Sequence, residues 1–340
     1  MDRVEGIQRV NEGLIHVVIL GAGASIATTQ RNPEPSGRQL PSMDNLVEVV
    51  GLKDLIGDLD IAERSNFEEI YSTLHKRDSE AERLGQIEDR IRDYFKDMAL
   101  PEAPTIYDYL VLALRPKDLI ATFNWDPLLY QAWSRNRDVG DSPRLAFLHG
   151  NVAIGYSTED EQAGPAGYRS KQTGHKFEPT TLLYPVTEKN YNESSFISRQ
   201  WERLTRDLEH CKRVTIFGYG APETDVEAIS LMKDAWGAKH ERNMEQFEII
   251  DIRPKDEVTD DWERFIHSHH YDYWNSYFES VFAKYPRRTG ERFMTQFFPT
   301  TPEEAFQDPN PVLQNVDTLE DLQEWHSPLI EAEEDFYSDT

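Results

Sequence analysis

The fold is inferred from one short stretch near the start of the chain, His16-Val17-Val18-Ile19-Leu20-Gly21-Ala22-Gly23-Ala24-Ser25. Residues 16–20 form a mostly apolar run that stops at Gly21, as is typical of a strand buried on both faces of a parallel sheet. In residues 21–25, small side chains let backbone N–H groups approach an anion at the positive end of a following helix. The stretch therefore indicates either a phosphate-binding loop or a tight strand-to-helix turn without a ligand.

Three later runs resemble the first strand, at residues 118–122, 213–217 and 247–250. Each ends in polar or glycine-rich residues, and helical patterns separate them. Alternating strands and helices predict an α/β fold, a Rossmann-like doubly wound parallel sheet. Ligands of such sheets bind at the carboxyl ends of the strands, so we expect the site there.

The stretch after the glycines disfavours a dehydrogenase. A Rossmann dehydrogenase carries a third glycine where this chain has Ile26, and an acidic residue closes its second strand about 20 residues on. Here residues 27–44 are rich in Pro, Ser and Asn, and we expect them to form a long loop.

Composition excludes several classes of protein. The formal net charge of -26 repels polyanions, so we expect no direct DNA binding. The single cysteine, Cys211, excludes an intrachain disulfide framework and a four-cysteine zinc module, and it is expected to be a small apolar residue in a helix before a strand. No apolar stretch has the length of a signal peptide or a membrane span, which predicts a cytoplasmic protein without a membrane segment.

We predict a nucleotide-binding domain over residues 1–290, with a helical insertion at about 52–115, and an acidic C-terminal extension over 291–340. Within the insertion, one helix face should be apolar, with Phe67, Ile70, Tyr71 and Leu74. Residues 163–181 are expected to be a loop at the site entrance. No Lys or Arg follows Arg292, so the extension is expected to be solvated, the alternative being that it docks on a partner.

Polar motifs follow the later strands. Thr122-Phe123-Asn124-Trp125-Asp126 ends the second strand, and Leu148-His149-Gly150 ends a short apolar run after it. In isolation, Asn124 and Asp126 could cap the next helix and His149 could be a hydrogen-bonded core residue. Together with the first glycine-rich stretch, these motifs favour a function.

The order of these motifs resembles the sirtuin-like (Sir2-type) NAD-binding family. The resemblance extends to the bacterial stand-alone branch of that family through Leu40-Pro41-Ser42, the element from Thr187 to Tyr191, and Gly218-Tyr219-Gly220 with Asp225. It spans residues 16 to about 253. Members of that branch commonly act as anti-phage effectors that deplete NAD.

The resemblance assigns roles to the matching residues. It implies that Gly21, Ala22, Gly23, Ala24 and Ser25 hold the pyrophosphate of NAD and that Thr122 belongs to the NAD-binding set. Asn124 would orient the nicotinamide ribose and the attacking water, Asp126 would lie near the carboxamide, and His149 would act as general base. Gly218, Tyr219, Gly220 and Asp251 would bind the adenosine end, where a carboxylate can accept both ribose hydroxyls. Asp225 is expected to cap the following helix, with a ligand contact as the alternative.

The resemblance implies an NAD glycohydrolase that cleaves the nicotinamide–ribose bond to give nicotinamide and ADP-ribose. One cysteine cannot build the zinc ribbon of sirtuin deacetylases, so no zinc is expected and hydrolysis is favoured over deacylation. The alternatives are a non-catalytic NAD or ADP-ribose sensor and an NAD-dependent protein deacylase. A toxic hydrolase needs a trigger, which predicts a homo-oligomer or a partner such as an ATPase or a nucleic-acid-sensing protein.

Two further segments receive structural interpretations. Consecutive histidines at 267, 269 and 270 point in different directions on a helix or a strand, so we expect no metal site there. The aromatic stretch Tyr271-Asp272-Tyr273-Trp274, with Tyr277 and Phe278, is expected to pack internally or to form an oligomer contact.

Overall fold

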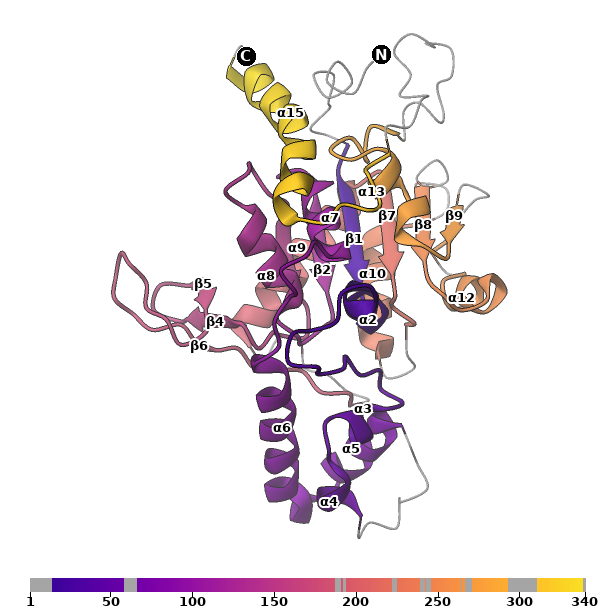
Figure 1. Ribbon diagram of the computed structural model, residues 1–340. Helices are drawn as coiled ribbons and strands as arrows, with labels where there is room; N and C mark the ends of the chain where they lie inside the picture. Colours follow the sequence, from indigo (N-terminus) through magenta and orange to yellow (C-terminus); the bar gives the residue numbers. More distant parts are fainter. Residues whose placement is uncertain are drawn as a thin grey trace.

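A six-stranded sheet lies at the centre of the protein (Figure 1). The computed structural model describes residues 14–57, 66–186, 191, 194–221, 225–238, 242, 246–263, 265–266, 271–292 and 311–338. The strands are β1 (His16–Leu20), β2 (Leu119–Thr122), β3 (Arg144–Phe147), β7 (Arg213–Phe217), β8 (Gln246–Ile250) and β9 (Tyr271–Trp274). They lie in the order β3-β2-β1-β7-β8-β9, and all neighbouring pairs are parallel. This is the order of a doubly wound Rossmann-like sheet, so the predicted fold class is confirmed.

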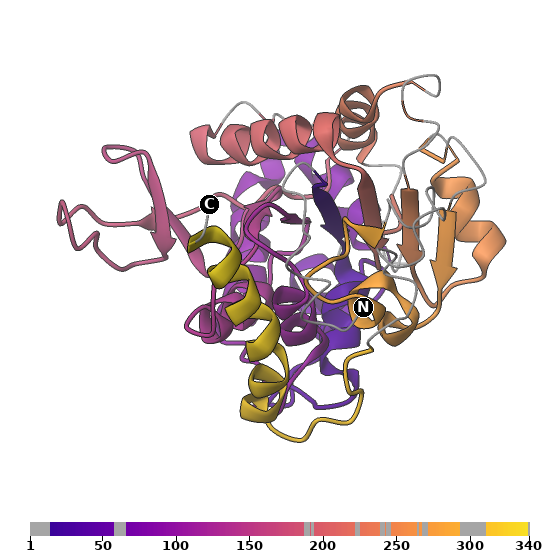
Figure 2. The ribbon, with the colours of Figure 1, turned by 90° about the horizontal axis from the view of Figure 1, so that it is seen from above.

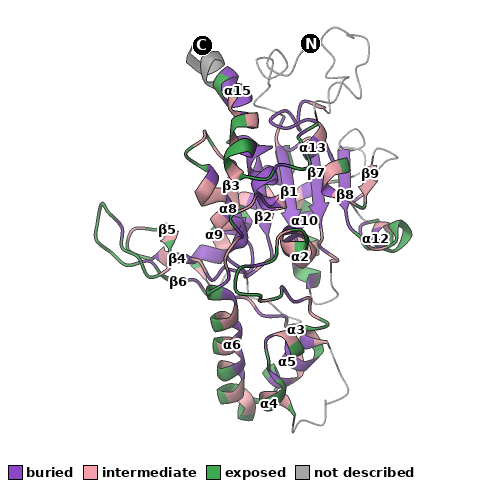
Figure 3. Cartoon of the chain, in the orientation of Figure 1, coloured by how far each residue is buried: buried purple, intermediate pink, exposed green. Residues whose placement is uncertain are grey.

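The sheet is buried on both faces, and side chains of β1 alternate between two apolar clusters. Val18 and Leu20 pack on one side, while Val17 and Ile19 pack on the other. The first side is covered by α2 (Ala22–Gln30), α7 (Ile106–Leu112) and α8 (Leu128–Asn136), and the second by α9 (Ser195–His210), α10 (Val226–Trp236) and α12 (Lys255–Asp261). Figure 2 shows the two helical layers, and Figure 3 shows the buried strands between them.

Two predicted boundaries need adjustment. The second strand begins at Leu119, because the buried Asp118 carboxylate accepts hydrogen bonds from the N–H groups of His16 (2.9 Å) and Arg115 (3.0 Å). The loop expected from residue 27 begins only after Gln30. Helix α2 continues because Ala24 and Thr28 bury one of its faces.

A helical part lies beyond the carboxyl edge of the sheet (Figure 1). It contains α3 (Leu46–Val49), α4 (Lys53–Ile56), α5 (Phe67–His75), the turn η1 (Asp78–Glu80) and α6 (Ala81–Lys96). The Asn66 side chain accepts the N–H of Glu68 at 2.8 Å and so starts α5. The face predicted to be apolar is buried, as expected, with Phe67, Ile70, Tyr71 and Leu74.

Residues 163–181, expected to be a loop at the site entrance, are mostly irregular over 166–177, but 163–165 and 178–179 belong to short strands. Strand β4 (Ile154–Ser157) pairs with both β5 (Gln162–Pro165) and β6 (Glu178–Pro179) in a small antiparallel sheet. This sheet projects away from the body of the protein (Figures 1 and 2). The two strands were not predicted because short polar strands lack the apolar run by which longer strands are recognised.

The C-terminal helix α15 (Leu319–Ser338) docks on the chain itself, which corrects the expectation of a solvated tail for this segment. Its buried stripe contains Leu322, His326 and Leu329, at helical spacing. One turn further, the buried Glu333 carboxylate bonds the Arg287 guanidinium, with Nε to Oε1 at 2.7 Å. Arg115 Nε lies 3.3 Å from Glu333 Oε2.

The aromatic stretch at the other edge packs internally, as one of the two expectations had it. After β9 come η3 (Tyr277–Glu279) and α13 (Val281–Lys284). The Tyr277 ring stacks on Phe282 with centroids 5.9 Å apart, and Phe278 meets Tyr109 edge-on at 5.3 Å. Cys211 is buried and precedes β7, as predicted, but it lies one residue after the end of α9 and not within the helix. Within the described ranges, no helix is both long and apolar enough to cross a bilayer.

Candidate functional site

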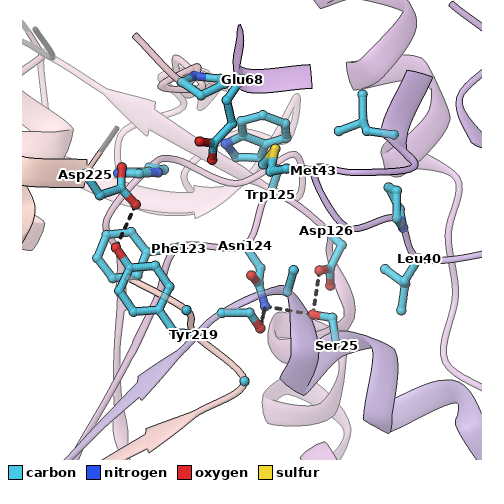
Figure 4. Close-up of a pocket in the computed structure, with 18 of the residues that line it drawn as sticks. Ser25, Leu40, Met43, Glu68, Phe123, Asn124, Trp125, Asp126, Tyr219 and Asp225 are labelled. Atoms are coloured by element: carbon cyan, nitrogen blue, oxygen red, sulfur yellow. Dashed lines mark hydrogen bonds between the residues drawn. The ribbon is translucent and has the colours of Figure 1, made fainter. Parts of the chain in front are cut away.

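A pocket of about 300 Å³ lies where the chain leaves β1, β2, β3 and β7. The wall on the sheet side consists of Gly21, Ala22, Ser25, Phe123, Asn124, Trp125, Asp126, His149, Gly218, Tyr219, Gly220 and Asp225. The opposite wall comes from the helical part and the chain leading to it: Leu40, Pro41, Met43, Asp44, Leu46, Asn66, Glu68 and Phe95. Segments far apart in sequence therefore enclose one space, drawn in Figure 4.

Asn124 is held by its side-chain amide. Its Nδ2 donates to the Gly21 carbonyl at 2.8 Å and to Ser25 Oγ at 2.9 Å (Figure 4). Its own backbone N–H donates to Thr122 Oγ1 at 3.0 Å. Because Nδ2 bonds to Gly21 and Ser25, Oδ1 lies on the other side of the amide. There it can accept a hydrogen bond from a hydroxyl or a water in the pocket.

Asp126 belongs to the same wall and is almost completely buried. Ser25 Oγ donates to Oδ2 at 2.7 Å, and the Leu128 N–H donates to Oδ1 at 3.0 Å. The second bond ties Asp126, one position before the N-cap residue Pro127, to the first residue of α8. Burial raises the pKa of the Asp126 carboxyl, while these two hydrogen bonds oppose the increase. Asn124, in contrast, makes its side-chain bonds to Gly21 and to Ser25 and Tyr107 of α2 and α7.

His149 lies after β3 and is 6% exposed. Its ring meets Phe123 edge-on with centroids 4.7 Å apart, and it stacks on Tyr191 at 6.1 Å. Phe123 in turn stacks on Tyr219 at 4.2 Å. The residues from Thr187 to Asn190 lie outside the described part of the chain, so only Tyr191 of that element is placed. Aromatic packing therefore fixes the imidazole plane at the pocket wall.

Asp225 occupies the N-cap position of α10, but its side chain makes no capping hydrogen bond. The expectation that Asp225 caps this helix is therefore corrected. Its Oδ2 accepts the hydroxyl of Tyr219 at 2.6 Å, and the residue lines the pocket (Figure 4). Its carboxylate therefore borders the pocket, as the alternative interpretation requires.

Gly21 and Gly23, at the start of α2, lie against Gly218 after β7. The Gly23 N–H donates to the Gly218 carbonyl at 2.9 Å, and Gly218 has a φ of +61°. A Cβ on Gly21 would lie 2.5 Å from the Gly218 oxygen. The predicted phosphate loop and the Gly-Tyr-Gly segment are therefore packed directly together, with space for only glycine between them.

A second pocket of about 720 Å³ adjoins the first and shares Ala22, Asp44, Gly218 and Gly220 with it. It follows the ends of β7 and β8, and Gly23 and Asp251 line it. Asp251 Oδ2 accepts from Arg253 Nη2 at 3.1 Å. Two residues of the predicted set line neither pocket: Ala24 is fully buried in α2, and Thr122 supports the Asn124 backbone from behind.

Sequence reasoning missed Tyr107, whose hydroxyl lies 2.7 Å from Ser25 Oγ, and the helical wall with Glu68 and Phe95. The capping-box residues Thr105 and Asp108 could have predicted the start of α7 from the sequence. They do not indicate where the Tyr107 side chain points. Among the described residues no group of His, Cys, Asp and Glu is placed to hold a metal ion, and the histidine cluster at 267–270 lies outside them.

No protein-family model matches the chain, and no curated protein matches it. Solved structures of Sir2 homologues are similar to it in fold. One, a complex with NAD, is 12% identical over 90% of this chain and 96% of that one, with a TM-score of 0.40. Another, a mutant bound to 2'-O-acetyl ADP-ribose, is 13% identical over 90% and 99%, with a TM-score of 0.42. A third, Sir2 with an inhibitor, 2'-O-acetyl-ADP-ribose and a deacetylated peptide, is 14% identical over 83% and 94%, with a TM-score of 0.38.

Proposed function

We propose that this protein binds NAD along the carboxyl edge of its sheet and hydrolyses the bond between nicotinamide and ribose. One observation carries the proposal: Asn124 and His149, from different strands, line the same pocket as the loop at Gly21, and this pocket joins a second one. A dinucleotide has two halves joined by a pyrophosphate. Two adjoining pockets with glycine-rich backbone at their junction match that shape.

In this proposal the pyrophosphate lies at the junction, by Ala22 and Gly218, at the start of α2. The adenosine half occupies the larger pocket, and the Asp251 carboxylate accepts from its ribose. The nicotinamide ribose lies in the smaller pocket. Carboxylates of Glu68 and Asp225 border that pocket and suit the cationic pyridinium ring of NAD.

The reaction breaks the bond between the ribose C1' and the nicotinamide nitrogen, and the electron pair leaves with neutral nicotinamide. The developing oxocarbenium ion needs positioning and charge stabilisation more than a strong nucleophile. A water held by Asn124 Oδ1 then bonds to C1', and His149 accepts the proton of that water. The apolar walls, with Phe95 and Trp125, keep other water away.

The test is nicotinamide release from NAD by the purified protein. We expect His149→Ala and Asn124→Ala to lose at least about a hundredfold in kcat, the size typical of a lost base or positioning group. Thermal melting of each variant checks the fold. Full activity in either folded variant would contradict the assignment, and an acetylated peptide added to the same assay tests deacylation instead.

We further propose that the activity is regulated, as in an NAD-depleting antiviral effector, through self-association or a partner ATPase or nucleic-acid sensor. Uncontrolled NAD hydrolysis would harm the cell that makes it, and the net charge of -26 disfavours direct sensing of DNA by this chain. Light scattering coupled to the nicotinamide assay tests this idea. A monomer that is fully active alone at micromolar concentration would contradict it.

A further inference from the structure

The Tyr107 hydroxyl is buried at the centre of a hydrogen-bonded cluster beneath the pocket. It lies 2.7 Å from Ser25 Oγ and 3.3 Å from Asn124 Nδ2, and the side chain is 0% exposed. Tyr107 does not line the pocket itself, so it has no direct contact with a molecule bound there. Any role it has in the reaction must act through its neighbours.

The number of protons available shows which group donates in each hydrogen bond of the cluster. Ser25 has one hydroxyl proton, which it donates to Asp126 Oδ2. Its Oγ can then only accept from Tyr107, so the tyrosine is the donor in that pair. The remaining lone pair of Ser25 Oγ accepts Asn124 Nδ2. In this chain of hydrogen bonds Tyr107 donates to Ser25 and Ser25 donates to Asp126. Toward the Asn124 amide, Ser25 Oγ can therefore act only as an acceptor.

This direction decides how the Asn124 amide is turned. Its nitrogen faces the Gly21 carbonyl at 2.8 Å as well as Ser25. The flipped amide would set Oδ1 against the Gly21 carbonyl and against an Oγ whose proton is already committed. Nδ2 is thus held toward the loop, and Oδ1 is held toward the pocket (Figure 4).

Tyr107 itself is rigidly placed. It lies in the first turn of α7, where Thr105 Oγ1 donates to Asp108 Oδ2 at 2.7 Å. Asp108 is fully buried, and its Oδ1 also accepts from Arg135 Nε at 2.6 Å and from Asn136 Nδ2 at 2.8 Å. The start of α7 is therefore fixed to α8, and the phenol is fixed with it.

We propose that Tyr107 is a positioning residue, which sets the Asn124 amide for the attacking water through the hydroxyl of Ser25. The proposal rests on the proposed NAD hydrolysis and adds a residue from α7 to that site. It assigns Asp126 the role of final acceptor in the same chain.

The experiment compares Tyr107→Phe with Tyr71→Phe. Tyr71 is also buried and its hydroxyl also donates to a side chain, that of Glu88, but it does not line the pocket. We expect Tyr107→Phe to lower kcat for nicotinamide release about tenfold, the effect of one hydrogen bond, with KM for NAD within about twofold. Tyr71→Phe should leave both unchanged. A Tyr107→Phe variant with wild-type kcat would overturn the proposal.

Two readouts separate positioning from a general loss of structure. Ser25→Ala should remove most of the effect of Tyr107→Phe, so the two losses in kcat should not add; additive losses would overturn a route through Ser25. The side-chain amide NMR signals of Asn124, identified by their absence in Asn124→Ala, should shift in Tyr107→Phe and stay in Tyr71→Phe. If the wild-type protein releases no nicotinamide, the proposed function fails. Unchanged Asn124 amide signals in Tyr107→Phe would overturn the role of Tyr107 independently of that result.

Discussion

Gly21 is packed so closely against the chain after β7 that one methyl group has no space. A Cβ there would lie 2.5 Å from both the Gly218 oxygen and the Tyr219 Cα. We expect Gly21→Ala to destabilise the fold by about 1–3 kcal/mol, as overpacking does, and to weaken NAD binding as well. Chemical denaturation and calorimetric titration measure the two effects.

Gly85 provides the matched control, because a Cβ there would meet nothing within 4 Å in α6. Gly85→Ala should stabilise the protein by about 0.5–1 kcal/mol, the helix-propensity difference, and leave NAD binding unchanged. A Gly21→Ala variant as stable as the wild type would show that the two loops can separate without cost.

Asp126 makes stability depend on pH in a direction that its burial determines. Burial raises its pKa above the ordinary value of 3.8. At pH values between the pKa of the unfolded state and the higher pKa of the folded state, the folded protein binds more protons than the unfolded protein. The contribution of Asp126 to stability therefore falls as the pH rises through this interval. Asn cannot ionise. The melting temperature of Asp126→Asn minus that of the wild type should therefore increase as the pH rises above about 4.

A difference in melting temperature that is constant over that range would contradict the shifted pKa. The comparison isolates Asp126, because the other buried carboxyls with raised pKa values, Glu248 and Glu291, are the same in both proteins.

At the level of elements, α15 is held by charge as well as by apolar packing. Glu333 faces Arg115 and Arg287, and all three side chains are buried. Neutralising the carboxylate would leave two buried guanidinium groups without this counter-charge. We expect Glu333→Gln to lower the free energy of unfolding by about 3–5 kcal/mol, as is typical of a broken buried pair.

Glu331 lies two residues away on the exposed side of α15 and is the control. Glu331→Gln should change stability by less than about 0.5 kcal/mol. Urea denaturation measures both variants. Equal stability of the two variants would mean that the Glu333 ion pairs contribute no net stability to the docking of α15.

For the whole molecule, 62 acidic against 36 basic side chains give a net charge of -26. Self-repulsion on this scale disfavours the compact state, and salt screens it. We expect the melting temperature to rise when NaCl increases from about 0.02 M to about 0.5 M. A fall would indicate that attractive ion pairs, such as those around α15, outweigh the repulsion.

Local pattern was enough to predict much of the fold. The strands at 16–20, 118–122, 213–217 and 247–250 follow from apolar runs between turn signals, and only the second and fourth begin one residue away from the predicted start. The buried face of α5 follows from helical periodicity. Because parallel strands bring their carboxyl ends to one edge, the sequence also places the segments at Gly21, Asn124 and His149 near one another.

Only the tertiary structure decided which other groups reach that edge. Tyr107 touches Ser25 across 82 positions of the chain, and Arg287 bonds Glu333 across 46. The docking of α15 on α7 is a contact of the same long-range kind. Periodicity reports which face of an element is buried, whereas the partner that buries it depends on packing between distant segments. The sequence determines this packing only through the whole fold, so no local pattern in one sequence reveals which distant segments meet.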